Sequence, residues 1–215
     1  MPRLPTVAVD VVIFTIDRGE LKTLLVRVKK GPYAGRWAFP GGLVPLGESL
    51  ETTARRELEE KTGIHDLYIE QLYTFGEPDR DPSGHVVSVA YFALVPHPVR
   101  PSTDDPKYAG VEWRAVRKLP RLAYGHNALA DYALTRLQAK LGYSNIAYAL
   151  LPAEFTLAEL HEVYESILGR SLDRRNFRKR VLQLGLLRPL SKERRGAHRP
   201  AALYAFARRS PQLLE

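Results

Sequence analysis

The chain of 215 residues can form one large domain or two small ones, and its 45% hydrophobic and 26% charged residues are typical of a globular protein. Because it has no cysteine, disulfides, thiolate zinc sites and cysteine nucleophiles are excluded, which fits a cytoplasmic protein. The net charge is +8, and the apolar run at residues 7–16 contains Asp10 and is too short to cross a membrane.

The chain opens with two predicted strands, at residues 6–16 and 21–29, which a polar turn joins into a hairpin. A loop punctuated by glycine and proline follows and includes a short strand at residues 37–40. Residues 47–63 then predict a helix, because Ser49 can cap its first turn and a glycine can end it.

Three further strands and a second helix complete the first predicted domain. Residues 69–78 and 86–95 predict strands on either side of a polar turn, and residues 110–116 predict a shorter strand. Residues 126–141 carry apolar side chains at helical spacing and predict an amphipathic helix. Together these elements predict an α/β (α+β) sandwich over residues 1–144.

The remaining residues, 145–215, predict a small second domain. Residues 156–169 begin with a capping box and predict a helix, and residues 171–185 predict a second helix that is rich in arginine. A hairpin follows, with strands at residues 186–190 and 201–206 and a polar, basic tip between them. Helix, turn, basic helix and hairpin is the order of a winged helix-turn-helix domain.

Positive charge is concentrated in this second domain. Residues 170–209 contain thirteen basic residues against Asp173 and Glu193, a net charge of +11. A block of this kind favours binding to a polyanion, above all nucleic acid, over a merely solvated surface.

The basic helix has one face for the core and another for nucleic acid. We expect Phe177, Val181 and Leu182 in the core, and Asn176 to read an adenine edge. The cationic side chains of the helix and wing tip would contact phosphates and the minor groove. The predicted DNA-contacting residues are Arg174, Arg175, Asn176, Arg178, Lys179, Arg194, Arg195, His198 and Arg199.

The first helix and the loop before it carry the most specific motif of the chain. Glu57, Glu60 and Lys61 stand at i, i+3 and i+4, so they share one helical face. The pattern resembles the Nudix box, which ends R-E-U-x-E-E-x-G-U, where U is apolar. The matching positions are Gly42, Glu48, Arg56, Glu57, Leu58, Glu60, Gly63 and Ile64.

The resemblance implies that this face holds Mg²⁺, with Glu57 and Glu60 as metal ligands and Arg56 orienting a carboxylate. Lys61 replaces a further carboxylate. Its ammonium can pair with Glu57, repel a divalent ion and attract a diphosphate directly. We therefore expect weak or absent Mg²⁺ binding and weak or absent hydrolysis, with ligand recognition retained.

The alternative is that Lys61 is exposed and tolerated, while a carboxylate from elsewhere rebuilds the metal site. The candidates for that carboxylate are Glu77, Asp79 and Asp81. The protein would then be an active Mg²⁺-dependent pyrophosphatase that cleaves ADP-ribose or a related nucleotide sugar.

The Nudix resemblance also implies a ligand built from a nucleoside diphosphate linked to another group. Arg36 can contact a phosphate, and Trp37 either stacks on a base or packs in the core. Gly42 lets its loop approach closely. The complete set of predicted ligand-binding residues is Arg36, Trp37, Gly42, Glu48 and Lys61.

Four other aromatic side chains give weaker signals. Tyr73 and Phe75 are predicted in the core, with base contact as the minor alternative. His85 and His126 are isolated histidines, and we predict surface or capping positions for them rather than catalytic ones.

Both domains together resemble the NrtR type, the Nudix-related transcriptional regulators of NAD metabolism. The resembling stretches are YIEQLYTFGEPDRD, LAYGHNALADYAL, EFTLAELHEVYESILGR, DRRNFRKRV and RRGAHRPAALYAF, which span nearly the whole chain. Such proteins commonly carry E-K-T-G at the end of the box, so Lys61 fits the group. Gly125 is a departure, because relatives often have an acidic residue there.

This resemblance implies a ligand-responsive regulator. Its degenerate Nudix domain would bind ADP-ribose or a related nucleotide, and its winged helix would bind a palindromic operator in duplex DNA as a homodimer. The alternatives are the active pyrophosphatase, with the basic domain as an accessory module, and an RNA-associated Nudix protein. Turnover and a preference for duplex DNA distinguish the three hypotheses.

Overall fold

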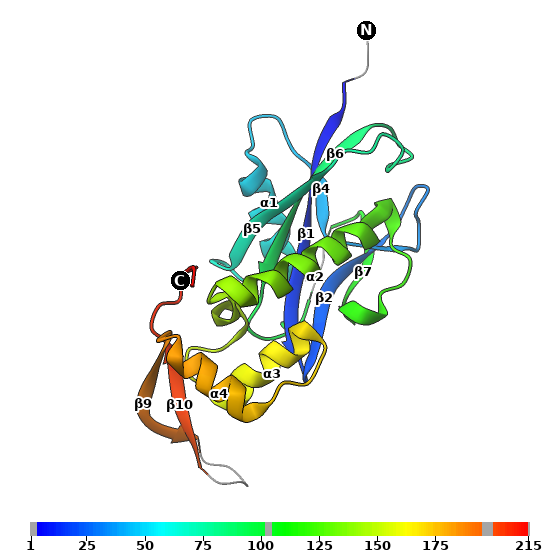
Figure 1. Cartoon of the computed structure of the whole chain (residues 1–215). Coiled ribbons are helices and arrows are strands. Elements are labelled where there is room, and N and C mark those ends of the chain that lie inside the picture. The colour runs from blue at the N-terminus through cyan, green and yellow to red at the C-terminus, as the bar shows by residue number, and fades with distance from the viewer. Residues whose placement is uncertain (1–3, 102–104, 195–199, 215) are drawn as a thin grey trace.

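A mixed sheet of seven strands forms the centre of the N-terminal domain in the structure, a computed structural model that describes residues 4–101, 105–194 and 200–214 (Figure 1). The strand order is β3-β2-β1-β6-β5, with β4 beside β1 and β7 beside β2. β1 and β6 run parallel, and the other pairs are antiparallel. In chain order the strands are β1 (Thr6–Asp17), β2 (Glu20–Val28), β3 (Trp37–Ala38), β4 (Gly41–Leu43), β5 (Tyr68–Phe75), β6 (Val86–Leu94) and β7 (Tyr108–Ala115).

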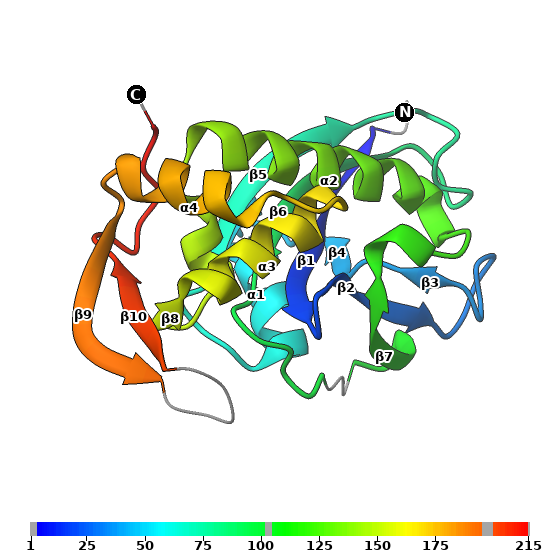
Figure 2. The same cartoon turned by 60° about the horizontal axis from the view of Figure 1, so that its bottom comes forward.

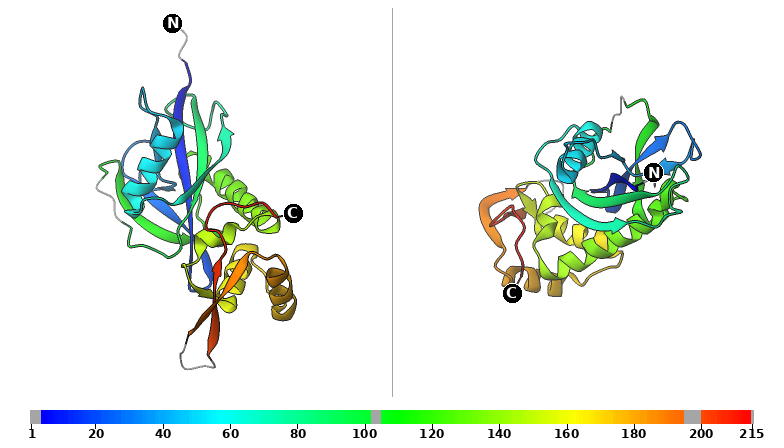
Figure 3. Two further views of the ribbon diagram at one scale, coloured as in Figure 1. Left: turned by 90° about the vertical axis from the view of Figure 1, so that its left-hand side faces the viewer. Right: turned by 90° about the horizontal axis from the view of Figure 1, so that it is seen from above.

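Helices α1 (Leu50–Thr62) and α2 (His126–Tyr143) cover opposite faces of this sheet (Figure 3). β1 is therefore buried on both faces, as expected of a continuous apolar strand at the centre of a sheet. The Ser49 side chain accepts a hydrogen bond from the backbone of Thr52 at the start of α1, and Gly63 ends the helix in a left-handed conformation. The predicted fold class and this predicted helix are confirmed.

The C-terminal domain has the order of a winged helix. The Thr156–Glu159 capping box at the start of α3 and the Asp173 cap of α4 are present. β9 and β10 form a hairpin that projects away from the body of the molecule (Figure 1). The elements are β8 (Phe155–Thr156), α3 (Leu157–Leu168), α4 (Arg174–Gln183), β9 (Leu187–Arg194) and β10 (Ala201–Phe206).

The strand β9 is longer than the sequence indicated. We predicted a polar tip from residue 191 onward, but residues 191–194 continue β9, and Arg194 pairs with Ala201. The prediction is wrong for these four positions because cross-strand pairing with β10, rather than local polarity, decides where the strand ends.

The two domains share one hydrophobic core. It includes Phe14 of the sheet, Leu137 of α2, Leu160 of α3 and Phe206 of β10. The chain between the domains is itself buried, because the short 3-10 helix η3 (Ile146–Leu150) lies inside this core. Figure 2 shows α3 and α4 lying alongside α2.

Two further short 3-10 helices, η1 (Val116–Lys118) and η2 (Ala123–Gly125), connect β7 to α2. Among the described residues, no helix is both long and apolar enough to cross a membrane.

Candidate functional site

The i, i+3 and i+4 spacing on the box helix brings an unusual set of charges together against the sheet. Lys61 is only 1% exposed. Its Nζ lies 3.3 Å from a carboxylate oxygen of Glu60, 3.9 Å from one of Glu57 and 3.8 Å from one of Asp105. The ammonium also lies over the ring of Tyr108, 5.3 Å from its centroid. A buried cation thus stands between three carboxylates.

The exposed position considered for Lys61 is wrong. Helix α1 packs this face against the sheet, so the i+4 neighbour of Glu57 is buried with it. In the described part of the chain, the carboxylates within 4 Å of the Lys61 ammonium are those of Glu57, Glu60 and Asp105. Asp105, rather than Glu77, Asp79 or Asp81, is thus the additional carboxylate beside Lys61. It comes from the segment before β7, which only the tertiary fold brings to the box.

Arg56 fixes the outer edge of this cluster. Its guanidinium lies 3.1 Å from Glu48, 3.5 Å from Glu60 and 3.6 Å from Glu57. Hydrogen bonds from Arg56 and from Thr53 hold the pKa of Glu48 below its ordinary value. Arg56 thus contacts three acidic side chains of the box.

The glycine loop before α1 approaches the cluster closely. A Cβ atom on Gly42 would lie 2.9 Å from a carboxylate oxygen of Glu57 and 3.5 Å from Nζ of Lys107. A Cβ on Gly41 would clash with the backbone oxygen of Val9. The hydroxyl of Tyr108 donates a 2.8 Å hydrogen bond to the Gly41 carbonyl, which anchors the loop. A side chain at Gly41 would therefore clash with β1, and one at Gly42 would crowd the Glu57 carboxylate.

The electrostatics of the cluster follow from burial and from two lysines. Burial raises the pKa of Glu57, against the opposing charges of Lys107 and Lys61. Burial acts in the same direction on Asp105, but hydrogen bonds from Lys107 and the charge of Lys61 outweigh it and lower the pKa. Lys107 is more than half exposed and lies 3.1 Å from Asp105, so it presents a positive charge to solvent beside Gly42.

This donor set does not fit a divalent cation. The Lys61 ammonium stands between Glu57, Glu60 and Asp105, where a Mg²⁺ ion would need their oxygens. Across residues 4–101, 105–194 and 200–214, no group of three His, Asp or Glu side chains is arranged to hold a metal. The charge that a metal would supply is already provided by the chain.

A second buried polar cluster lies beside the glycine loop. His126, at the start of α2, is only 2% exposed, and its Nδ1 accepts a 2.9 Å hydrogen bond from the backbone of Phe39. Its Nε2 lies 3.4 Å from Asp10, which also accepts a hydrogen bond from Ser88 and lies 3.8 Å from Arg80. The predicted surface or capping position of His126 is therefore wrong, because α2 docks its first turn onto the sheet.

Arg36 and Trp37 occupy different environments. Arg36 is exposed and lies over the ring of Tyr33, which packs edge-on against Tyr124. Trp37 packs against the core, and the guanidinium of Arg114 lies 4.9 Å from its ring centroid. Of the two alternatives for Trp37, the structure favours core packing over base stacking.

Other exposure predictions have mixed outcomes. Phe75 is buried as predicted, but Tyr73 is 51% exposed and stacks on Tyr132. β5 is the edge strand, with a bulge between Gln71 and Tyr73, so Tyr73 faces solvent rather than the core. His85 is exposed as predicted.

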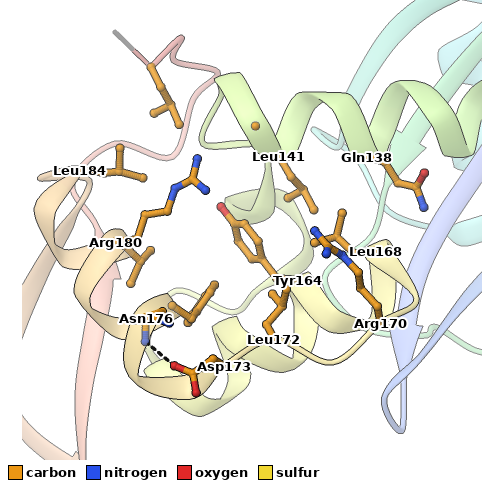
Figure 4. Close-up of a pocket in the computed structure, with 14 residues that line it drawn as sticks. Gln138, Leu141, Tyr164, Leu168, Arg170, Leu172, Asp173, Asn176, Arg180 and Leu184 are labelled. Atoms are coloured by element: carbon orange, nitrogen blue, oxygen red, sulfur yellow. Dashed lines mark hydrogen bonds between the residues drawn. The ribbon is translucent and has the colours of Figure 1, made fainter.

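Helix α4, the second helix of the helix-turn-helix and therefore its recognition helix, presents its basic residues to solvent. Phe177 and Val181 pack inward as predicted, but the prediction is wrong for Leu182, which is 39% exposed. Asn176 lines a cavity between α4 and α2 (Figure 4). Arg194 pairs with Glu159. The exposed predicted residues on α4 are Arg174, Arg175, Asn176, Arg178 and Lys179, whereas Arg195, His198 and Arg199 lie outside the described residues.

Fold and site together define a Nudix domain followed by a winged helix DNA-binding domain. Residues 4–136 match the NUDIX domain family, and residues 147–206 match the NrtR DNA-binding winged helix domain. The chain belongs to the NrtR family.

Individual relatives extend over nearly the whole chain. The "ADPR responsive transcriptional repressor NtrR" of Acinetobacter baylyi is 36% identical, over 94% of this chain and 82% of the relative. Shewanella oneidensis NrtR in complex with a 27mer DNA has a TM-score of 0.80 and 36% identity, over 93% of each chain. The NUDIX domain of Shewanella oneidensis NrtR in complex with ADP ribose has a TM-score of 0.57 and 37% identity, over 63% of this chain and 90% of that one.

Proposed function

We propose that this protein is a transcriptional regulator of NAD metabolism that binds ADP-ribose or a related nucleotide at its Nudix box without cleaving it. The observation that carries the proposal is the buried Lys61 ammonium between Glu57, Glu60 and Asp105. The ADPR-responsive repressor and the ADP ribose complex among its relatives support this choice of ligand.

The proposed ligand would lie in the cleft between the glycine loop and the box helix. Lys61 is too deeply buried to serve as an open contact, so its role is to neutralise the carboxylates that would otherwise repel a diphosphate. Lys107, which is exposed beside Gly42, is the ammonium available to a phosphate group. Arg36, on the neighbouring exposed loop, would contact the ligand from outside.

The same charges argue against hydrolysis. A metal-assisted pyrophosphatase needs free carboxylate oxygens to hold its cation. Here the positive charges of Lys61 and Arg56 lie 3.3–3.9 Å from carboxylate oxygens of Glu57 and Glu60, where they would repel a divalent cation. The alternative, an active Mg²⁺-dependent pyrophosphatase, would require Lys61 to leave this position.

The test compares wild type with Lys61→Glu, which restores the box carboxylate. We expect wild type to bind ADP-ribose in calorimetry with EDTA present and to release no AMP when Mg²⁺ is added. Lys61→Glu should lose the EDTA-insensitive binding and gain Mg²⁺-dependent AMP release. Lys118→Glu, at an exposed lysine of the same domain, is the matched control and should behave as wild type.

Two results would contradict the proposal. Rapid AMP release by wild type would favour the enzyme alternative. Failure of wild type to bind ADP-ribose at all would show that the ligand class is wrong.

The proposed DNA interface is the solvent face of α4 together with the wing. We expect Arg175→Ala with Arg178→Ala to weaken binding to duplex promoter DNA, and the slope of log affinity against log salt to fall by about one for each phosphate contact removed. Arg121→Ala, at an exposed arginine of the Nudix domain, should leave both quantities unchanged. Equal binding of wild type to RNA of the same sequence would favour an RNA-associated role.

We also propose that the protein acts as a homodimer on a palindromic operator in the cytoplasm. A two-fold site on DNA is matched by a two-fold symmetric protein, with one winged helix on each half-site. Light scattering after size-exclusion chromatography would give twice the chain mass, and a monomer at micromolar concentration would argue against the dimer.

A further inference from the structure

A cavity with mainly apolar walls lies behind helix α4, away from the Nudix box. It has a volume of about 360 Å³ and lies between α2, α3 and α4 (Figure 4). Leu141 of α2, Leu168 of α3 and Leu184 at the end of α4 line it, so walls from both domains enclose the same space. Pockets of this size hold small organic molecules.

Its walls are mainly apolar. Tyr164, Phe177 and Val181 add to the leucines, and these side chains come from the two helices of the winged domain. The backbone of Leu214, from the C-terminal tail, is hydrogen-bonded to the Tyr143 carbonyl at the end of α2 and closes one side. Binding of an apolar or aromatic group there would remove these walls from water, which lowers the free energy.

Two arginines give the cavity a positive charge. Arg170 and Arg180 both line it, and neither has an ion pair within the described part of the chain. Figure 4 shows the side chains of Arg180 and Tyr164 extending toward one another. The lining carboxylate, Asp173, is occupied as the cap of α4, where it accepts a 2.8 Å hydrogen bond from the backbone of Asn176.

We propose that this cavity binds a small amphipathic anion, with its apolar body between α2 and α4 and its carboxylate, sulfonate or phosphate group at one of the two lining arginines, Arg170 or Arg180. The site is separate from the Nudix cleft and does not depend on the proposed effector. Because its walls come from both domains, an occupant would touch the effector domain and the recognition helix at once.

The test is a fluorescence titration with 8-anilinonaphthalene-1-sulfonate, an aromatic anion, on the full chain. We expect saturable binding that ADP-ribose does not displace. Gly142 lines the cavity, and a Cβ there meets no atom within 4 Å, so we expect Gly142→Phe to fold normally and its ring to occupy part of the cavity. This variant should lower the affinity for the probe about tenfold or more.

Ala139→Phe is the matched control, because Ala139 is an exposed residue of the same helix outside the cavity lining. It should leave probe affinity unchanged. Replacing both Arg170 and Arg180 by glutamine should lower the affinity for the anionic probe about tenfold. The affinity for the neutral probe N-phenyl-1-naphthylamine should not change. The proposal is overturned if Gly142→Phe has no effect, if Ala139→Phe is equally damaging, or if the arginine replacements affect both probes alike.

Discussion

At the scale of single residues, buried charges in this protein are tuned by neighbours that the sequence does not bring near. Asp10 is an example. Burial alone would raise its pKa, but His126, Ser88 and Arg80 outweigh burial and hold the pKa below the ordinary value. The Asp10 carboxylate therefore ties β1 to β6 and to the start of α2.

The lowered pKa of Asp10 predicts a pH-dependent contribution to stability. Because the folded state favours the charged form, the contribution is present above the unfolded pKa near 3.8 and is lost as the pH falls through the folded value. Asp10→Asn should lower the free energy of unfolding by about 1–3 kcal/mol at neutral pH and by less at pH 3. Urea unfolding at both pH values measures this difference, and a cost that does not shrink in acid would contradict it.

Gly42 predicts a local effect on ligand binding. Gly42→Ala would place a methyl group 2.9 Å from Glu57, in the cleft between the loop and the box helix. We expect ADP-ribose affinity to fall about tenfold, a change of about 1.4 kcal/mol. Gly110→Ala is the control, because a Cβ at Gly110 meets no atom within 4 Å. Unchanged calorimetric affinity for both variants would show that the ligand lies elsewhere.

At the scale of elements, the end of α3 is held by the Nudix domain. Arg117 of η1 and Gln138 of α2 both donate hydrogen bonds to the Ile167 carbonyl, at 3.2 Å and 2.9 Å. The Ser166 hydroxyl donates to the Gly19 carbonyl in the β1–β2 turn, at 2.9 Å. Gly169 follows with φ of +68° under the Arg117 guanidinium. The hairpin and α2 thus fix the orientation of the first winged-helix helix.

The contact between Arg117 and Gly169 predicts that alanine substitutions at two glycines with the same backbone conformation lower the free energy of unfolding by different amounts. Gly169→Ala and Gly185→Ala both incur left-handed strain, about 1 kcal/mol. Only the methyl group introduced by Gly169→Ala would displace the Arg117 side chain. We expect Gly169→Ala to cost about 1–2 kcal/mol more in denaturant unfolding. In an Arg117→Ala background this extra cost should vanish, and its persistence would show that the strain lies elsewhere.

At the scale of the whole molecule, the shared core makes the two domains one folding unit. Tyr148 of η3 packs edge-on against both Tyr68 of β5 and Phe206 of β10. Contacts of this kind cross the boundary between the domains, so neither can unfold without exposing apolar surface of the other.

A single cooperative unfolding transition is therefore expected. Trp37 and Trp113 report on the Nudix domain, whereas far-ultraviolet circular dichroism also reports on α3 and α4. The two thermal transitions should coincide in wild type. Phe206→Ala should lower the midpoint temperatures of both transitions equally and reduce the free energy of unfolding by about 3–5 kcal/mol. Two separated transitions would show that the shared core does not couple the domains.

The sequence by itself determined the local elements and the chemistry of the box. Ser49 and Gly63 mark the ends of α1, Thr156 and Asp173 mark the starts of α3 and α4, and the i, i+4 spacing places Glu57 beside Lys61. These features depend on neighbours within one turn of helix, so local pattern was sufficient. The exposure of Tyr73 was not predictable in this way, because it depends on which strand forms the edge of the sheet.

The tertiary structure decided what surrounds those residues. Asp105 meets Lys61, His126 meets Asp10, and Arg180 faces α2 because segments far apart in the chain pack against one sheet and one core. No spacing rule connects such pairs, since their separation along the chain has no fixed relation to their distance in space. The sequence shows Lys61 only as a substitution in a motif, whereas the structure shows that it is a buried cation beside three carboxylates.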